Sequence, residues 1–176
     1  MLSVIAPLKK REEQAAIKSA TAHLAGMLSD RYRVFGAELR IEKPARPRAA
    51  PERAIAVVVV DYGNRRTLEV ITDPNGKVLG VDERAIPPAW SREEITEARA
   101  IAERDSLVAR VAKLKGVFVS EFGPEPARDN ARRIGLRYAV VRKGRLGAEL
   151  LHAIVDLSAA TLVRIEQLSV NPNRRS

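Results

Sequence analysis

The amino-acid sequence predicts an α+β protein made of two similar halves, each a helix packed on a mainly antiparallel sheet of about four strands. Apolar residues recur at helical spacing in two segments, and alternating or β-branched runs separated by turn residues follow each segment. The order of these elements then repeats along the chain. An antiparallel sheet with a helix across one face buries the apolar stripe of the helix and one face of the sheet together.

The composition fits a globular chain and limits its chemistry. Of the 176 residues, 45% are hydrophobic but only 4% are aromatic, so the core must be mainly Val, Ile, Leu and Ala, and platforms for stacking nucleic-acid bases are scarce. The sequence has no cysteine, which excludes disulfides, thiolate zinc sites and cysteine nucleophiles. The net charge of +9 attracts phosphates, acidic proteins and anionic membranes alike. No apolar run approaches membrane-spanning length. We expect a cytoplasmic protein, and whether a leader peptide was removed stays open.

The first half begins with a predicted amphipathic helix over residues 12–30. A strand is expected over 32–41. Residues 44–51 predict a stiff, basic loop, because proline cannot donate a hydrogen bond to a sheet. The apolar stripe of the helix consists of Ile17, Ala20, Leu24 and Leu28.

Three further strands are predicted in the first half. The continuous β-branched run over 54–60 is typical of a strand buried on both faces, and a turn follows at 61–64. Strands over 67–71 and 77–81 flank Asp-Pro-Asn-Gly at 73–76, in which proline fixes φ and Asn-Gly tolerates positive φ. This is the strongest hairpin signal in the chain.

The second half repeats this order. Ser91 and Glu94 predict a helix start in which the serine hydroxyl and the glutamate satisfy free backbone amides. Apolar residues before and after 105–106 fall on different faces, so the helix is expected to break or kink there. Strands are expected over 116–122, 137–142, 148–156 and 161–166, with a hairpin turn at 144–147.

An offset of 83 positions brings identical residues of the two halves together in matching contexts. One extra residue in the later turn then aligns 78–82 with 162–166. We therefore place the two repeats at residues 1–86 and 87–176. Chance similarity is the alternative, because hydrophobic strands resemble one another easily. The identical pairs are Val34 with Val117, Phe35 with Phe118, Glu38 with Glu121, Ala56 with Ala139, Val57 with Val140, Val58 with Val141, and Asp73 with Asp156.

Residues 87–95, 117–126, 137–141 and 154–157 resemble the small amino-terminal α/β domains of copper amine oxidases, and the resemblance covers roughly 54–168. Those domains have a cystatin-like layout, a helix on a four-stranded antiparallel sheet, which implies two cystatin-like repeats here. In that family the copper and quinone chemistry resides in a separate, larger domain with an Asn-Tyr-(Asp/Glu)-Tyr motif and histidine ligands. This sequence has neither, so the resemblance implies an accessory role without cofactors.

Catalytic and metal-binding signals are weak. The two histidines, His23 and His152, fall on the first helix and in a late strand, without the spacing of a metal site. No serine lies in a nucleophile elbow, and no glycine-rich phosphate loop occurs. Adjacent carboxylates near the predicted helix starts are most simply favourable charges for the helix dipole. Asp73 and Asp156 are expected to open equivalent turns. We predict no enzyme and no metal site.

Two proline-rich connections, one in each half, carry the candidate anion-binding or partner-binding residues. If the halves pack about a pseudo-twofold axis, their guanidinium groups could together bind phosphate or carboxylate. These residues are Arg46, Arg48 and Arg53 in the first half, and Arg128, Arg132 and Arg133 in the second.

We therefore expect a non-catalytic accessory or protein-interaction module, with a protein partner or a homo-oligomer formed through a sheet face or edge. The alternative is a nucleic-acid-binding protein whose basic loops contact phosphates in a salt-dependent way. Two other readings stay open. The loop arginines could serve only solubility, and a sheet could enclose a small-molecule cavity.

Overall fold

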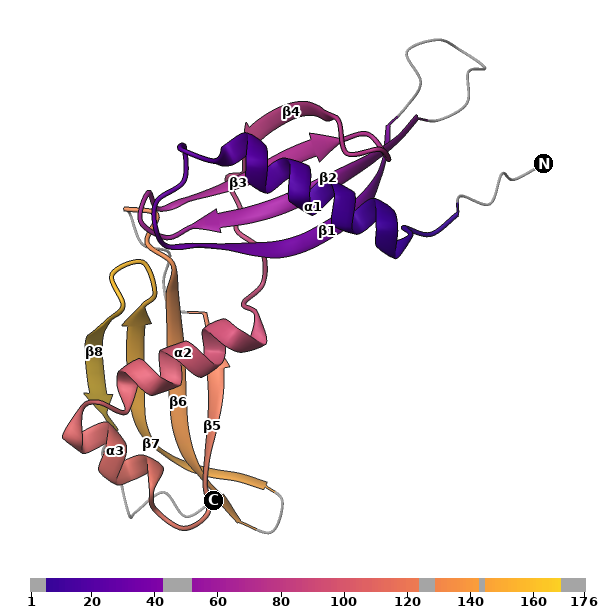
Figure 1. The fold of residues 1–176 in the computed structure, drawn as a ribbon. Helices are drawn as coiled ribbons and strands as arrows, with labels where there is room; N and C mark the ends of the chain where they lie inside the picture. The colour runs from indigo at the N-terminus through magenta and orange to yellow at the C-terminus, as the bar shows by residue number, and fades with distance from the viewer. Residues whose placement is uncertain (1–5, 43–51, 124–128, 143–144, 169–176) are drawn as a thin grey trace. The chain divides into compact units, whose positions relative to one another are not determined.

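A computed structural model of the protein describes residues 6–42, 52–123, 129–142 and 145–168 (Figure 1). The chain divides into two compact units, Met1–Ala89 and Trp90–Ser176. Each unit contains a four-stranded antiparallel sheet whose strands lie in chain order, with helical structure on one face. The predicted α+β class, two repeated halves that each place a helix on an antiparallel sheet, is confirmed.

The helix of the first unit is shorter than the predicted segment 12–30. The helix ends at Leu24 because the chain then turns at Gly26, whose φ of 83° is the left-handed conformation that favours glycine. Leu28 still packs against the core beyond the helix end. The predicted loop at 44–51 lies outside the described residues. The elements are α1 (Lys10–Leu24), β1 (Tyr32–Glu42), β2 (Glu52–Asp61), β3 (Arg66–Thr72) and β4 (Val78–Glu83).

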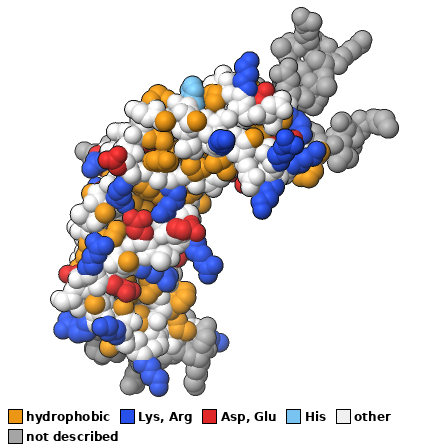
Figure 2. Space-filling view, viewed as in Figure 1, with side chains coloured by type: hydrophobic (Ala, Val, Ile, Leu, Met, Phe, Trp, Pro, Cys, Tyr) orange, Lys and Arg blue, Asp and Glu red, His pale blue; other side chains and the backbone are white. Residues whose placement is uncertain are grey.

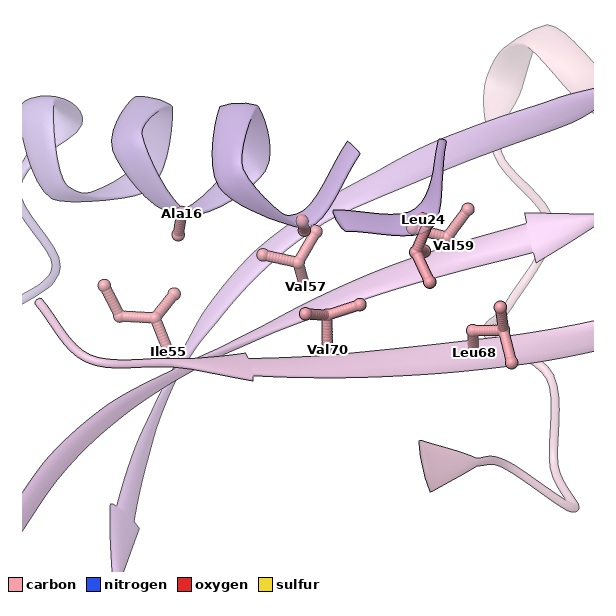
Figure 3. Close-up of a cluster of buried hydrophobic side chains, with 8 residues drawn as sticks. Ala16, Leu24, Ile55, Val57, Val59, Leu68 and Val70 are labelled. Carbon is pink, nitrogen blue, oxygen red and sulfur yellow. The ribbon is translucent and has the colours of Figure 1, made fainter. Parts of the chain in front are cut away.

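The β-branched run of β2 is buried on both faces, as predicted. Alternate residues of a strand point to opposite faces of the sheet, so one set lies under α1 and the other lies on the opposite face. Ala54 and Ala56 of the second set form a separate buried cluster with Ile71. Burial of one large aliphatic side chain contributes about 1.5–3 kcal/mol. The cluster under α1 consists of Ala16, Ala20, Leu24, Ile55, Val57, Val59, Leu68 and Val70 (Figure 3).

A buried carboxylate, Asp61, joins the connection after α1 to the turn after β2. It accepts hydrogen bonds from the Ser29 hydroxyl and backbone N–H, and from the Asn64 side-chain amide at 2.7 Å and backbone N–H at 3.3 Å. Burial alone raises the pKa of Asp61, but the hydrogen bonds from Ser29 and Asn64 outweigh it and lower the pKa below its ordinary value of 3.8.

The second unit contains two helices where the sequence predicted a break. Asp105 separates them and caps the second helix, since its side chain accepts hydrogen bonds from the N–H groups of Leu107 and Val108. The predicted cap at Ser91 is also confirmed, because its hydroxyl accepts from the Glu94 N–H. The elements are α2 (Arg92–Ala102), α3 (Ser106–Ala112), β5 (Val117–Phe122), β6 (Arg133–Arg142), β7 (Arg145–Asp156) and β8 (Thr161–Gln167).

The hairpin between β6 and β7 differs from its prediction. Residues 144–147 were expected to form the turn, but Arg142 pairs with Arg145, so Gly147 belongs to β7. Strand pairing therefore extends into the positions 145–147 that were predicted to turn. β6 also begins earlier than the predicted residue 137.

The core of the second unit lies between α2 and the middle strands β6 and β7. Ile134, Leu136 and Tyr138 of β6 are fully buried, as are Leu151 and Val155 of β7. Burial raises the pKa of Tyr138 to about 12, and the nearby Glu103 charge adds to this while Arg99 opposes it. Tyr138 occupies the position of Ile55 in the aligned first unit.

The fourth strand of each unit has an irregular pairing at the aligned position. In β4 the pairing skips Leu79, because Ile71 pairs with Gly80 and Thr72 with Val78. In β8 it skips Val163 in the same way. Both skipped residues are β-bulges, and their side chains are 58% and 50% exposed.

The turns that precede these strands are also equivalent. The Asp73 carboxylate accepts hydrogen bonds of 2.8 Å from the N–H groups of Asn75 and Lys77. The Asp156 carboxylate accepts from Ser158 and Ala159 at 2.7 and 3.1 Å. The predicted role of both aspartates as openers of matching turns is confirmed.

We expect Asp61→Asn to lower the free energy of unfolding at neutral pH by about 1–3 kcal/mol, because the variant loses the charged acceptor of these hydrogen bonds. The folded-state pKa of Asp61 lies below its unfolded value of 3.8, so the stabilisation is present above about pH 4 and is lost as the pH falls further, through the folded-state pKa. Urea unfolding measured over this pH range should show that the free energies of unfolding of the wild type and the variant become equal in acid. A difference that does not depend on pH would contradict this role.

Candidate functional site

The structure describes three of the six arginines predicted to bind anions or a partner. Arg46, Arg48 and Arg128 lie outside the described residues. The other three, Arg53, Arg132 and Arg133, each lie near a carboxylate of their own unit.

Arg132 lies inside the second unit rather than on a surface loop. It is only 8% exposed, and its Nε and Nη2 donate to the two carboxylate oxygens of Glu94 at 2.7 and 2.8 Å. Glu94 is fully buried and also accepts from the Ser91 N–H at 2.9 Å. This two-pronged pair therefore joins the start of α2 to the start of β6 and is a structural contact.

Arg53 makes the corresponding contact in the first unit. Its Nη2 donates to Glu12 at 3.2 Å, and the same carboxylate accepts from the Lys9 N–H at 3.0 Å. The Lys9 N–H lowers the pKa of Glu12; partial burial opposes this effect, and the Arg53 charge adds to it. Glu12 and Glu94 are each the third residue of their helix, so both units use one device to fix the helix start.

Arg133 is the most surface-like of the three. Its side chain is 30% exposed, and its guanidinium lies 3.6 Å from Asp129 and 4.0 Å from Asp156. Such loose ion pairs at a surface contribute about 0–1 kcal/mol. The arginines predicted as one anion-binding set thus have different structural roles where they are described.

A cluster that the sequence did not predict lies on the face of the second sheet opposite α2. Ile134, Leu136 and Tyr138 of β6 are buried on the helix side, so Arg137 between them points to the other face. The strand register then places Ser120, Arg137, His152 and Glu166 in one row across the four strands.

Two carboxylates of this face lie near the His152 ring, and an arginine contacts one of them. Its Nε2 lies 3.0 Å from a Glu149 carboxylate oxygen, and its Nδ1 lies 4.0 Å from Glu166. The Nε of Arg137 lies 3.2 Å from the other oxygen of Glu149. The imidazole is thus flanked by two carboxylates, one of which an arginine also contacts.

Phe122 completes the cluster. Its ring centroid lies 5.0 Å from that of His152, and the Arg137 guanidinium lies 5.7 Å from its centroid. The ring covers Gly135, where a Cβ atom would come within 2.5 Å of it, so any larger residue there requires the ring to move. Phe118, two residues before Ser120 on the same strand, is 52% exposed. We call Phe118, Phe122, Arg137 and His152 the aromatic face.

In the first unit, the position aligned with His152 has charges of opposite sign: an acidic residue lies between two arginines. Glu69 corresponds to His152 at the offset of 83, and it lies between Arg40 at 2.8 Å and Arg84 at 3.8 Å. The first unit has Ala54 where the second has Arg137. Phe118 has a counterpart in Phe35 of the first unit, whereas Phe122, Arg137 and His152 have none, so their cluster belongs to the second unit.

In the described part of the chain, both polar contacts of the His152 ring are carboxylates, which orient the imidazole. Among the same residues, no group of three or more His, Cys, Asp or Glu side chains could hold a metal ion. No helix within the described ranges is long and apolar enough to cross a membrane.

Comparisons with family models, curated proteins and solved structures do not show a family for this chain. No family model and no curated protein matches the chain. Among solved structures, it is similar to the Bacillus megaterium YpeB C-terminal domain, with 11% identity and a TM-score of 0.28. The similarity covers 88% of this chain and 62% of that one, so the chain spans less than two thirds of that structure. The resemblance to amine oxidase amino-terminal domains gains no support from family models or curated proteins.

We expect Arg132→Ala to lower the free energy of unfolding by about 3–5 kcal/mol, because it leaves the buried Glu94 carboxylate without its partner. The neighbouring Arg133→Ala is the matched control and should cost less than about 1 kcal/mol. Chemical denaturation of both variants measures the difference. Equal losses would refute the distinction between a buried pair and a surface pair.

Proposed function

We propose that the chain is a non-catalytic interaction module whose second unit binds a protein partner through the aromatic face. The observation that carries the proposal is that the Phe122 ring lies near both Arg137 and His152, on a strand whose Phe118 is exposed. Aromatic and arginine side chains supply most of the binding energy of protein interfaces. Held in place by neighbours, they lose little conformational entropy when a partner binds.

The surroundings of the aromatic face support the same proposal. Glu149, Glu166 and Arg164 are 35%, 40% and 63% exposed, and Arg164 forms an ion pair with Glu166. Mixed charges around an aromatic centre match the polar rim of a protein interface. They are less suited to nucleic acid, since both carboxylates would repel phosphate.

The strand edges offer a poorer binding route than the face. β1, β4 and β8 each contain a bulge, at Phe35, Leu79 and Val163 respectively. The β5 edge is regular, but Arg99 donates to its Val119 carbonyl at 2.8 Å. Bulges and capped carbonyls both hinder the addition of a further strand. Of the two routes expected from the sequence, we therefore favour the face.

The alternative function, nucleic-acid binding through the basic loops, receives no support from the described residues. Arg53, Arg132 and Arg133 all contact carboxylates. The accessory role implied by the resemblance to amine oxidase domains agrees with a binding module, and it rests on sequence alone.

The test is site-specific photo-crosslinking in cells. Replacing Phe118 with benzoylphenylalanine keeps an aromatic ring on the aromatic face. Irradiation should yield one or a few defined protein adducts. The same replacement at Leu79, which is 58% exposed on β4 of the first unit, is the matched control and should not yield them.

Dependence on the neighbouring side chains makes this test specific. Arg137→Ala and His152→Ala, each combined with the photoreactive residue, should reduce the adducts at least about tenfold if these side chains belong to a hot spot. Adducts that persist unchanged in both variants, or adducts with nucleic acid alone, would overturn the proposal.

A further inference from the structure

One end of the second unit gathers basic side chains that form no ion pair with the described residues. The end of α3, the start of β5 and the start of β7 meet there, since the Val141 N–H donates to the Gly116 carbonyl at 2.8 Å and Arg142 pairs with Arg145. We call this region the basic end, and Figure 2 shows Lys and Arg side chains around α3 at the bottom of the view. Its exposed cations are Arg110, Lys113, Lys115 and Arg145.

The sequence around the basic end contains no acidic residue. Segments 106–119 and 137–148 have neither Asp nor Glu, although carboxylates contact Arg133 and Arg137 in this unit. Arg110 lies in the last turn of α3 and Lys113 caps its end, where cations are favourable for the helix dipole. That explanation covers two of the four charges and leaves Lys115 and Arg145.

An exposed apolar side chain lies within this positive region. Leu114 is 50% exposed and follows α3 between Lys113 and Lys115. An aliphatic side chain gains nothing from phosphate contact, but it gains from entering the acyl boundary of a bilayer. Lysines beside it can then reach the headgroups with their ammonium groups.

We infer that the basic end attaches the second unit to an anionic lipid surface. Each basic residue near such a surface contributes about a fivefold gain in partitioning, and insertion of Leu114 adds an apolar contribution. The contact is peripheral and is reversed by salt. It uses residues outside Phe122, Arg137 and His152, so it stands or falls separately from the proposed protein contact.

The experiment is co-sedimentation of the full chain with vesicles. Vesicles of phosphatidylcholine with about 30% phosphatidylserine should bind the protein at low salt, and neutral phosphatidylcholine vesicles should not. Replacing Arg110, Lys113, Lys115 and Arg145 with Gln should reduce partitioning by about 600-fold. Leu114→Ser should reduce it by roughly three- to tenfold at unchanged charge.

The matched control removes the same amount of charge elsewhere. Lys10, Lys18, Lys77 and Arg92 are exposed, and replacing them with Gln should leave most of the binding. Equal losses in the two quadruple variants would mean that net charge alone drives binding, and this would overturn the inference. Failure to bind anionic vesicles would overturn it too. So would binding to duplex DNA that needs the four cations but is indifferent to Leu114→Ser, which would assign the basic end to nucleic acid.

Discussion

A glutamate at the third residue of the helix fixes each helix to its sheet. Glu94 is fully buried, and a carboxylate in that position is tolerated only because Arg132 and the Ser91 N–H satisfy it. Glu12 does the same with Arg53 and Lys9 in a more exposed setting. The apolar stripes alone would let a helix slide or rotate on the sheet, because hydrophobic burial has no direction. The charged pair selects one position.

Once the helix position is fixed, the composition of the opposite sheet face follows from the period of a strand. In β6 the residues under α2 must be apolar, which leaves Gly135, Arg137 and Ala139 for the other face. Gly135 makes room for the Phe122 ring, and the ring then lies near both Arg137 and His152. The aromatic face therefore depends on a helix that lies on the other side of the sheet.

The fold was predictable because its main signals are periodic. The two-faced burial of β2 and the break at Asp105 follow directly from apolar spacing and turn residues. The site was not predictable, because a one-residue change of register turns every side chain to the other face, and the sequence does not give the register. Nor did residue type distinguish the buried Arg132 from the surface-like Arg133. One signal was available: Glu94 falls on the same stripe as Ala98 and Ile101, where a charged residue implies a buried partner.

The two units show how few positions a repeated fold leaves for function. Bulges, turns and helix-anchoring glutamates recur in both, because each solves a structural problem that both copies share. At the aligned centre of the opposite face, Glu69 between two arginines becomes His152 between two carboxylates. Changes there leave the core under the helix intact. The cluster of Phe122, Arg137 and His152 therefore arises from differences between the copies, beside a phenylalanine position, Phe35 and Phe118, that they share.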